Sequence, residues 1–260
     1  MRLKILSYNI HKGFDWKNKQ YFLKEMKDFI ESSQADIVFL QEVVGKNTKY
    51  EKKGIIDSQF EYLADQLWPH FSYGQNAVYD HGHHGNVILS KFPIEHYQNI
   101  DLSTNKHEKR GLLLCKIQIP HPGQPSPSYF YAACSHLNLL HRGRLKQYQK
   151  IKKHLLHTQQ EGDMPLVIAG DFNDWNKKAI NVFEGDLKMQ EVHKTMHGQF
   201  ARTFPAFLPF LPLDRIYVKN AIVRQAERLK PKRPFSFFRH LSDHLPLFCE
   251  VEIQPPFMHH

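Results

Sequence analysis

The 260-residue sequence contains no long hydrophobic run, and this absence excludes one class of protein. A helix that crosses a bilayer needs about 20 consecutive apolar residues, and no stretch approaches that length. The first residues, MRLKILSYN, also lack the apolar stretch and the small-residue cleavage site of a secretory signal. We therefore expect no transmembrane segment and no export signal, and the start of the chain is interpreted as a strand.

Cysteine is scarce as well, with three residues in the whole chain. Cys115, Cys134 and Cys249 each lie in an apolar, strand-like run. An odd number of cysteines on buried strands argues against a disulfide framework and for reduced thiols in the core. The cytoplasm is therefore the expected location.

Acidic residues are in the minority, with 26 Asp and Glu against 35 Lys and Arg, so the net charge is +9. A basic balance favours polyanionic partners, which include nucleic acid, an anionic membrane surface and phosphorylated small molecules. A surface charge that serves only solubility is the alternative, and charge alone does not choose between them. Disorder is excluded because 41% of the residues are hydrophobic and 23% are charged.

Hydrophobic periodicity predicts a layered α/β protein. Pairs of strands alternate with single helices, so we expect two mixed sheets packed face to face with helices outside, in one domain over residues 1–260. A Pro- and Ser-rich segment, 121–128, connects two adjacent strands as a hairpin loop, which is inconsistent with a purely parallel sheet. The predicted helices cover 19–32, 57–68 and 143–157, and the predicted strands cover 3–8, 35–41, 71–79, 86–90, 111–119, 128–135, 166–170, 214–220, 221–227 and 245–253.

Polar side chains recur where the predicted strands end or begin. Each of them alone is better explained as a turn residue, a helix cap or a solvated strand end. Strand starts and strand ends meet at one edge of a mixed sheet, however, and ligands of layered α/β proteins bind at such edges. Six such places together therefore indicate one site. Its members are Asn9, Glu42, His136 with Asn138, Asp171 with Asn173, Asp214, and Asp243 with His244.

The residue types at this edge suit one chemistry. Asn9, Glu42 and Asp243 offer hard oxygen ligands, which suit Mg²⁺ or Mn²⁺ better than zinc. Asp214 is able to orient a histidine and stabilise its cation, and Asp171 is able to accept a proton from water. These are the components of metal-assisted phosphoester hydrolysis.

Seven motifs in order carry a resemblance to a known family. They are LSYNIHKG (6–13), LQEV (40–43), GNVILSKFPI (85–94), SHLN (135–138), IAGDFNDW (168–175), LDRIYV (213–218) and LSDHLPL (241–247). With these motifs the sequence resembles the endonuclease/exonuclease/phosphatase superfamily over residues 5 to about 250, which implies a four-layer α/β/β/α sandwich. That family includes deoxyribonuclease-like nucleases, abasic-site endonucleases, inositol-phosphate 5-phosphatases, sphingomyelinases and deadenylases.

The resemblance implies a role for each matching residue. Glu42 would hold the Mg²⁺, with the Asn9 amide beside it and Asp243 near the metal. Asp171 would activate the attacking water and Asn173 would orient it. The remaining positions would act on the phosphate: His244 as the catalytic histidine paired with Asp214, and His136, Arg110 and Asn138 as phosphate contacts. In IAGDFNDW, strand alternation places Phe172 in the core, and we expect Trp175 to pack there rather than to stack on substrate.

The substrate is less well defined. The segment 230–240 (KPKRPFSFFRH) mixes basic and aromatic residues and suits either nucleic acid or an anionic lipid surface. The segment 204–213 (FPAFLPFLPL) suits packing under a loop or contact with a membrane. We expect a monomeric phosphodiester hydrolase that acts on nucleic acid. A phospholipid or phosphorylated-lipid hydrolase with peripheral membrane contact is the alternative, and a non-catalytic binding member is the third option. Exposure of Phe207, Leu208 and Phe210 on the face of the site would favour lipid.

Overall fold

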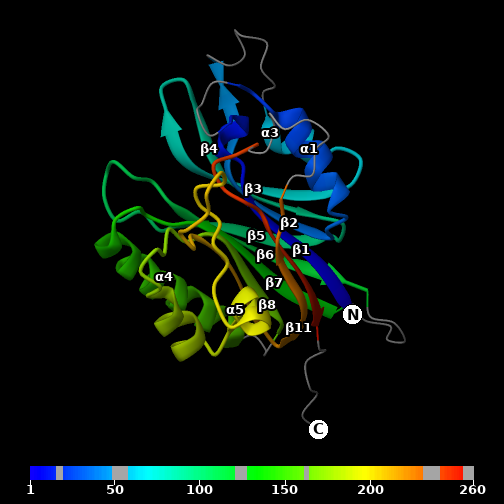
Figure 1. Ribbon diagram of the computed structural model, residues 1–260, viewed down its shortest axis with the longest axis vertical. Helices are drawn as coiled ribbons and strands as arrows, with labels where there is room; N and C mark the ends of the chain where they lie inside the picture. The colour runs from blue at the N-terminus through cyan, green and yellow to red at the C-terminus, as the bar shows by residue number, and fades with distance from the viewer. Residues whose placement is uncertain (16–19, 49–57, 121–127, 161–163, 231–240, 254–260) are drawn as a thin grey trace.

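The computed structural model describes residues 1–15, 20–48, 58–120, 128–160, 164–230 and 241–253. Two six-stranded sheets dominate it (Figure 1). The first has the order β11-β12-β1-β2-β4-β3 and the second the order β5-β6-β7-β8-β10-β9. Both are mixed, because β1 and β2 pair in parallel in the first, β7 and β8 pair in parallel in the second, and the other pairs are antiparallel.

The strands of the first sheet come from both ends of the chain, and those of the second come from its middle. The first sheet contains β1 (Arg2–Asn9), β2 (Ile37–Asn47), β3 (His70–Tyr79), β4 (Gly82–Ser90), β11 (Ala221–Arg228) and β12 (Leu247–Ile253). The second contains β5 (Ile94–Asp101), β6 (Gly111–Ile119), β7 (Ser128–His136), β8 (Leu166–Asp171), β9 (Gln190–Glu191) and β10 (Asp214–Lys219).

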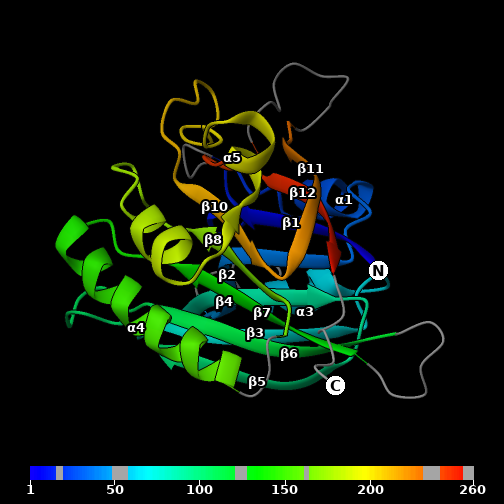
Figure 2. The ribbon, with the colours of Figure 1, turned by 90° about the horizontal axis from the view of Figure 1, so that it is seen from below.

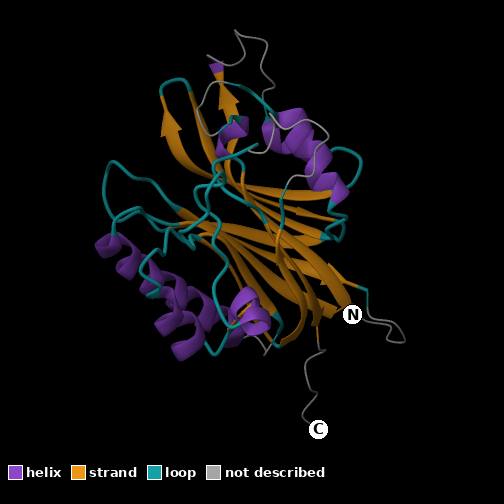
Figure 3. Cartoon of the chain, viewed as in Figure 1, coloured by secondary structure: helices purple, strands orange, loops and turns teal. Residues whose placement is uncertain are grey.

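Helices cover the outer faces of the two sheets, which makes four layers (Figures 2 and 3). On the first sheet lie α1 (Leu23–Ser32) and α3 (Gln59–Ala64), and on the second lies α4 (His141–Gln160). Smaller elements are η1 (His11–Gly13), η2 (Asn181–Asp186) and α5 (Val192–His197). The fold is therefore the expected α/β/β/α sandwich, and no helix among the described residues is long and apolar enough to cross a membrane.

Each layer boundary has its own hydrophobic core, set by side-chain periodicity. In β1, Leu3 and Ile5 point between the sheets, while Leu6 and Tyr8 point toward α1. In α4, the spacing of Tyr148, Ile151 and Leu155 puts all three against the second sheet. The two sheets therefore pack against each other through the inward-facing side chains of their strands. A site is able to form where these rows of inward-facing side chains end.

Two parts of the fold do not follow from hydrophobic pattern. The strand β5 was not predicted, because it is an edge strand whose side chains are mostly exposed and it has no apolar run. The elements η2, β9 and α5 lie in a stretch with poor periodicity and were not predicted either. The loop at 121–128 was predicted between β6 and β7, and these strands do pair antiparallel, although 121–127 lie outside the described residues.

Candidate active site

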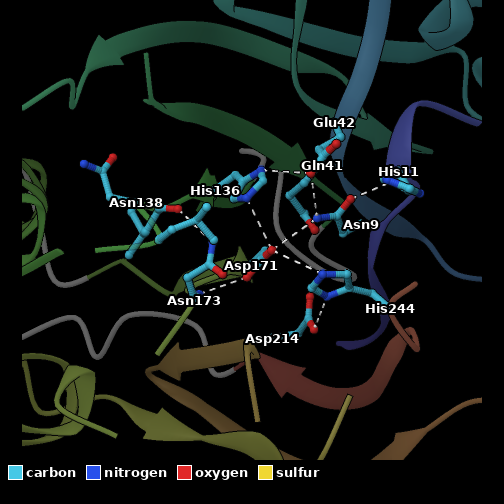
Figure 4. Close-up of polar contacts among 12 residues, drawn as sticks. Asn9, His11, Gln41, Glu42, His136, Asn138, Asp171, Asn173, Asp214 and His244 are labelled. Carbon is cyan, nitrogen blue, oxygen red and sulfur yellow. Dashed lines mark hydrogen bonds and ion pairs between the residues drawn. The ribbon is translucent and has the colours of Figure 1, made fainter. Parts of the chain in front are cut away.

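The site continues the inner face of the sheets beyond its last apolar residues. In β8, Val167 and Ala169 point into the core between the sheets, so Asp171 is the next inward position. Register then pairs Asp171 with His136 on β7 and with Asp214 on β10. Three ionisable groups on adjacent strands thus lie side by side on the inner face (Figure 4).

Asp171 is the centre of this cluster. Its Oδ2 lies 3.1 Å from Asn9 Nδ2, which donates to it, and 3.3 Å and 3.6 Å from the Nε2 atoms of His136 and His244. Its Oδ1 accepts a hydrogen bond from the backbone N–H of Asn173 at 2.9 Å. Burial raises the pKa of Asp171 to about 6, with Asp214 adding to the shift and His244 opposing it.

His244 is held as a cation by two carboxylates. Its Nδ1 lies 2.8 Å from Asp214 Oδ2, and its ring lies 5.0 Å from that of Phe204, centroid to centroid. Burial would lower the pKa of His244, but Asp214 and Asp171 outweigh burial and raise it to about 10. With Nδ1 bonded to Asp214, Nε2–H faces the site as a charged donor.

His136, in contrast, is held in its neutral form. Burial, reinforced by Arg110, holds its pKa well below the ordinary value, although Glu42 opposes the shift. The ring bridges two carboxylates, since Nδ1 lies 4.0 Å from Glu42 Oε1 and Nε2 lies 3.3 Å from Asp171 Oδ2. The site therefore combines one neutral and one cationic histidine.

Glu42 reaches the site through a break in strand alternation. Gln41 points inward, toward Cys134, so regular alternation would turn Glu42 outward. A register shift between Leu40 and Val43, together with a φ of 57° at Glu42, turns the carboxylate back toward the site instead. A left-handed conformation at a non-glycine residue inside a strand is costly, which is typical of functional positions.

The surroundings of Glu42 fit a divalent cation. Its Oε2 lies 3.1 Å from the Lys12 ammonium, and Asn9 Nδ2 lies 3.5 Å from Oε1. Burial would raise the pKa of Glu42, but His136 and Lys12 outweigh it and hold the pKa below its ordinary value. An ionised carboxylate is a ligand that Mg²⁺ and Mn²⁺ prefer, and such an ion would take the place of the Lys12 ammonium at Oε2. Asp171, Asp214 and His244 also offer ligand atoms within 4.8 Å of one another, but a cationic histidine is a poor ligand.

Asn9 and Asp243 lie on either side of His11. The Asn9 Oδ1 accepts from the backbone N–H of His11 at 3.0 Å, and Asp243 Oδ1 lies 3.9 Å from His11 Nδ1. Asn9 thus presents its nitrogen, not its oxygen, to Glu42 and Asp171. As a metal ligand it would have to turn its amide, whereas Asp243, with a quarter of its side chain exposed, offers an accessible oxygen.

Two predicted phosphate contacts lie apart from the cluster around Asp171. The buried Asn138 amide donates to Thr104 Oγ1 and accepts from Gln147, both at 2.8 Å, so the structure does not bring it to the site. Arg110 pairs with Glu108 at 2.8 Å. It also lines a cavity of about 380 Å³ that reaches Glu42.

Sequence reasoning missed the other basic residues of this cavity, which are Lys12, His84, Lys106, His107 and Lys109. Lys12 and His84 line it together with Glu42 and Arg110. Lys12 could have been found, because it follows Asn9 by three residues within the motif LSYNIHKG. His84 lies on β4, in the part of the strand that precedes the predicted range 86–90.

Beyond Asp171, the residues of the segment IAGDFNDW differ in burial and in role. Phe172 is fully buried, as predicted, and Asn173 supports Asp171 through its backbone while its side chain donates to Leu137 O at 2.9 Å. Asp174 is structural, because it accepts from Tyr148 Oη at 3.1 Å and from two backbone N–H groups. The prediction that Trp175 packs in the core is wrong, since 52% of it is exposed in the turn after the strand.

Comparisons with known proteins agree with this architecture. Residues 6–244 match the model of the Endonuclease/Exonuclease/phosphatase family, and the chain belongs to that family. It is 42% identical over 253 residues to the protein YbhP of Escherichia coli strain K12, covering 96% of each chain. Two solved structures share the fold: a mannosyl-6-phosphatase of Bacteroides thetaiotaomicron (16% identity, TM-score 0.69, 96% and 99% covered) and D. rerio TDP2 complexed with single-strand DNA product (18% identity, TM-score 0.69, 96% and 99% covered).

Proposed function

We propose that this chain is a metal-dependent hydrolase of phosphodiesters in which water attacks phosphorus directly. The observation that carries the proposal is the buried contact of Asp171 with a cationic histidine, a neutral histidine and the Asn9 amide. A carboxylate of pKa about 6 is ionised at neutral pH and still basic enough to accept a proton. Phosphoester hydrolysis is also the chemistry of the family to which the chain belongs.

The residues divide the reaction between them. Asp171, held by the Asn173 backbone, orients a water molecule and receives its proton as the new P–O bond forms. The bond from phosphorus to the leaving oxygen breaks on the opposite side, in line and without a covalent intermediate, and that oxygen takes its proton from solvent water to leave as an alcohol. His244 donates through Nε2–H to the phosphoryl oxygens, where charge accumulates, and Asp214 fixes its tautomer.

Glu42, Asp243 and Asn9 would hold Mg²⁺ or Mn²⁺, which would supply Lewis-acid stabilisation of the phosphoryl oxygens. The Lys12 ammonium, 3.1 Å from Glu42, marks the place where that carboxylate binds positive charge. Lys12, Arg110 and His84 line the cavity beside it and are suited to anionic substrate groups.

For the substrate, we favour a phospholipid or phosphorylated lipid over nucleic acid. The preference for nucleic acid rested on the net charge of +9 and on the segment 230–240, of which 231–240 lie outside the described residues. The apolar segment 204–213 is described, and Phe207, Leu208 and Phe210 are each more than half exposed. The segment contacts the site, because the Phe204 ring packs on His244 and Ala206 N donates to Asp243 O at 2.7 Å.

Nucleic acid stays the second candidate because of the +9 charge and the basic cavity. A cytoplasmic monomer stays our expectation.

One activity screen tests the proposed function. The purified chain would be assayed on bis-p-nitrophenyl phosphate, phospholipid vesicles, plasmid DNA and single-stranded RNA, with Mg²⁺, with Mn²⁺, with Zn²⁺ and with EDTA. We expect hydrolysis with Mg²⁺ or Mn²⁺ that EDTA abolishes, and the highest rate on vesicles. Full activity in EDTA, or rescue by Zn²⁺ alone, would disprove the metal assignment. Cutting of plasmid or RNA with intact vesicles would reverse the preference for lipid.

A further inference from the structure

Six large apolar side chains are exposed on the loops that carry the site. We call them the apolar rim. They lie on three segments: one after His136, one after Asp171 and one before Asp214. The rim consists of Leu139 (65% exposed), Leu140 (72%), Trp175 (52%), Phe207 (52%), Leu208 (66%) and Phe210 (57%).

Two buried arginines tie these segments together. Arg144 donates to the backbone carbonyl of Leu139 at 2.5 Å and its guanidinium lies 5.7 Å from the Trp175 ring centroid. Arg215 donates to Pro212 O at 2.5 Å and to Asp174 O at 3.3 Å. Because β7, β8 and β10 are neighbours in the sheet, the three segments lie side by side at the same edge as Asp171.

The exposed ionisable groups carried by the three rim segments themselves have one sign of charge. The segments 137–147, 172–180 and 200–213 contain a single acidic residue, Asp174, and it is fully buried. Their exposed ionisable residues are all basic: Arg142, Lys146, Lys177, Lys178 and Arg202. Exposed apolar groups bordered by cations are the combination that binds an anionic bilayer, through insertion of the former and attraction of the latter.

We infer that the apolar rim is a docking surface for an anionic lipid bilayer. Nucleic acid does not explain it, because three of its six members are leucines, which do not stack on bases. Docking would hold the mouth of the site at the depth of the lipid headgroups, so that a phosphodiester reaches Asp171 and His244 without leaving the membrane. The inference rests on the proposed function for its substrate, although docking itself is measurable without catalysis.

Vesicle co-sedimentation of the full chain tests the surface. Vesicles of phosphatidylcholine alone would be compared with vesicles that also contain phosphatidylglycerol. We expect binding to the anionic vesicles, and a loss of at least about tenfold in partitioning for Leu208→Ser/Phe210→Ser. Leu139→Ser/Leu140→Ser changes a separate segment and should act alike, so misfolding of one variant does not decide the result. Tyr97→Ser, at a residue 54% exposed on β5, is the matched control and should bind like the wild type.

Salt and charge reversal separate the electrostatic contribution to vesicle binding from the apolar contribution. Lys177→Glu/Lys178→Glu should weaken binding to anionic vesicles, and the remaining apolar binding should respond weakly to salt. Wild-type partitioning by both rim variants, or no vesicle binding at all, would overturn the inference. So would binding to a DNA duplex or to a protein that the rim variants abolish while vesicles stay unbound. An active enzyme without vesicle binding would refute docking alone, whereas a vesicle-binding chain without hydrolase activity would refute the proposed function alone.

Discussion

The layer of side chains between the two sheets differs in chemistry at its two ends, although the same strands form both ends. Where β1, β7 and β8 begin, their inward side chains are Leu3, Phe130 and Val167, and the layer is closed by hydrophobic packing. Where the same strands end, the inward positions are polar: Asn9, His136 and Asp171.

This comparison shows what the fold contributes to the site. Alternation and register bring Asn9, His136 and Asp171 together with the same precision that packs the core, whereas His244 comes from the bend that precedes β12. The cost is that ionisable groups are buried, and the pKa of Asp171 is raised to about 6 as a result. The predictions below disturb one end or the other.

The largest effect is expected at the polar end. His244→Ala or Asp171→Ala should each lower turnover of bis-p-nitrophenyl phosphate by at least about a thousandfold, because each removes a group that acts mainly in the transition state. Asp214→Asn should also be severe, since it disturbs the tautomer and charge of the histidine. His96→Ala, at an exposed position on the edge strand β5, is the control and should leave turnover unchanged. Near-normal turnover of His244→Ala would refute the site.

Gly170→Ala changes the strand directly beside Asp171, at the polar end. Gly170 has a φ of 146°, and a Cβ there would lie 1.9 Å from the backbone oxygen of Ser135 on β7. We expect a loss of about 3 kcal/mol in the free energy of unfolding, measured in urea, because both strain and a backbone clash have to be relieved. Gly198→Ala is the matched control: its φ is 71°, but nothing lies within 4 Å, so only the strain applies. Equal losses for the two variants would show that the contact with Ser135 is unimportant.

Glu42→Gln sharpens the comparison by removing a charge without changing shape. The Mg²⁺ concentration for half-maximal activity should rise by about a hundredfold, while turnover at saturating metal falls less. Glu61→Gln, on the exposed face of α3, should leave the metal requirement unchanged. An unaltered metal requirement in Glu42→Gln would mean that the ion binds at Asp171 and Asp214 instead.

Glu42 also marks the limit of what the sequence predicts. Strand periodicity and the order of the motifs predicted the sandwich and brought Asn9, His136 and Asp171 to one edge. The same periodicity would have turned Glu42 away from the site, because the backbone bulge that reverses it has no signature in the hydrophobic pattern. The pairing of Lys12 with Glu42 likewise depends on contacts between segments, which residue spacing does not define.

The solvent exposure of individual aromatic side chains was the other feature that the sequence did not fully predict. Phe172 and Trp175 are both large aromatics after the same strand, but one is fully buried and the other is half exposed. Alternation predicts the first correctly because it continues the strand. The second lies beyond the strand in a turn, where Arg144 from α4 positions it, so its environment depends on tertiary packing.

The smallest expected effect is on the stability of the fold, and it arises from a second buried carboxylate that lies away from the site. Glu191 accepts the backbone N–H of Lys194 at the start of α5, and burial raises its pKa to about 7, although Arg215 opposes the shift. Below about pH 4.5 the group is protonated in both the folded and the unfolded state, and as pH rises toward 7 the unfolded state ionises first, so stability falls. Glu191→Gln cannot ionise, and its stability relative to wild type should increase by about 2 kcal/mol between pH 5 and pH 8. Urea unfolding of both proteins at the two pH values measures this difference, and a constant difference would mean that Glu191 ionises alike in the folded and unfolded chain.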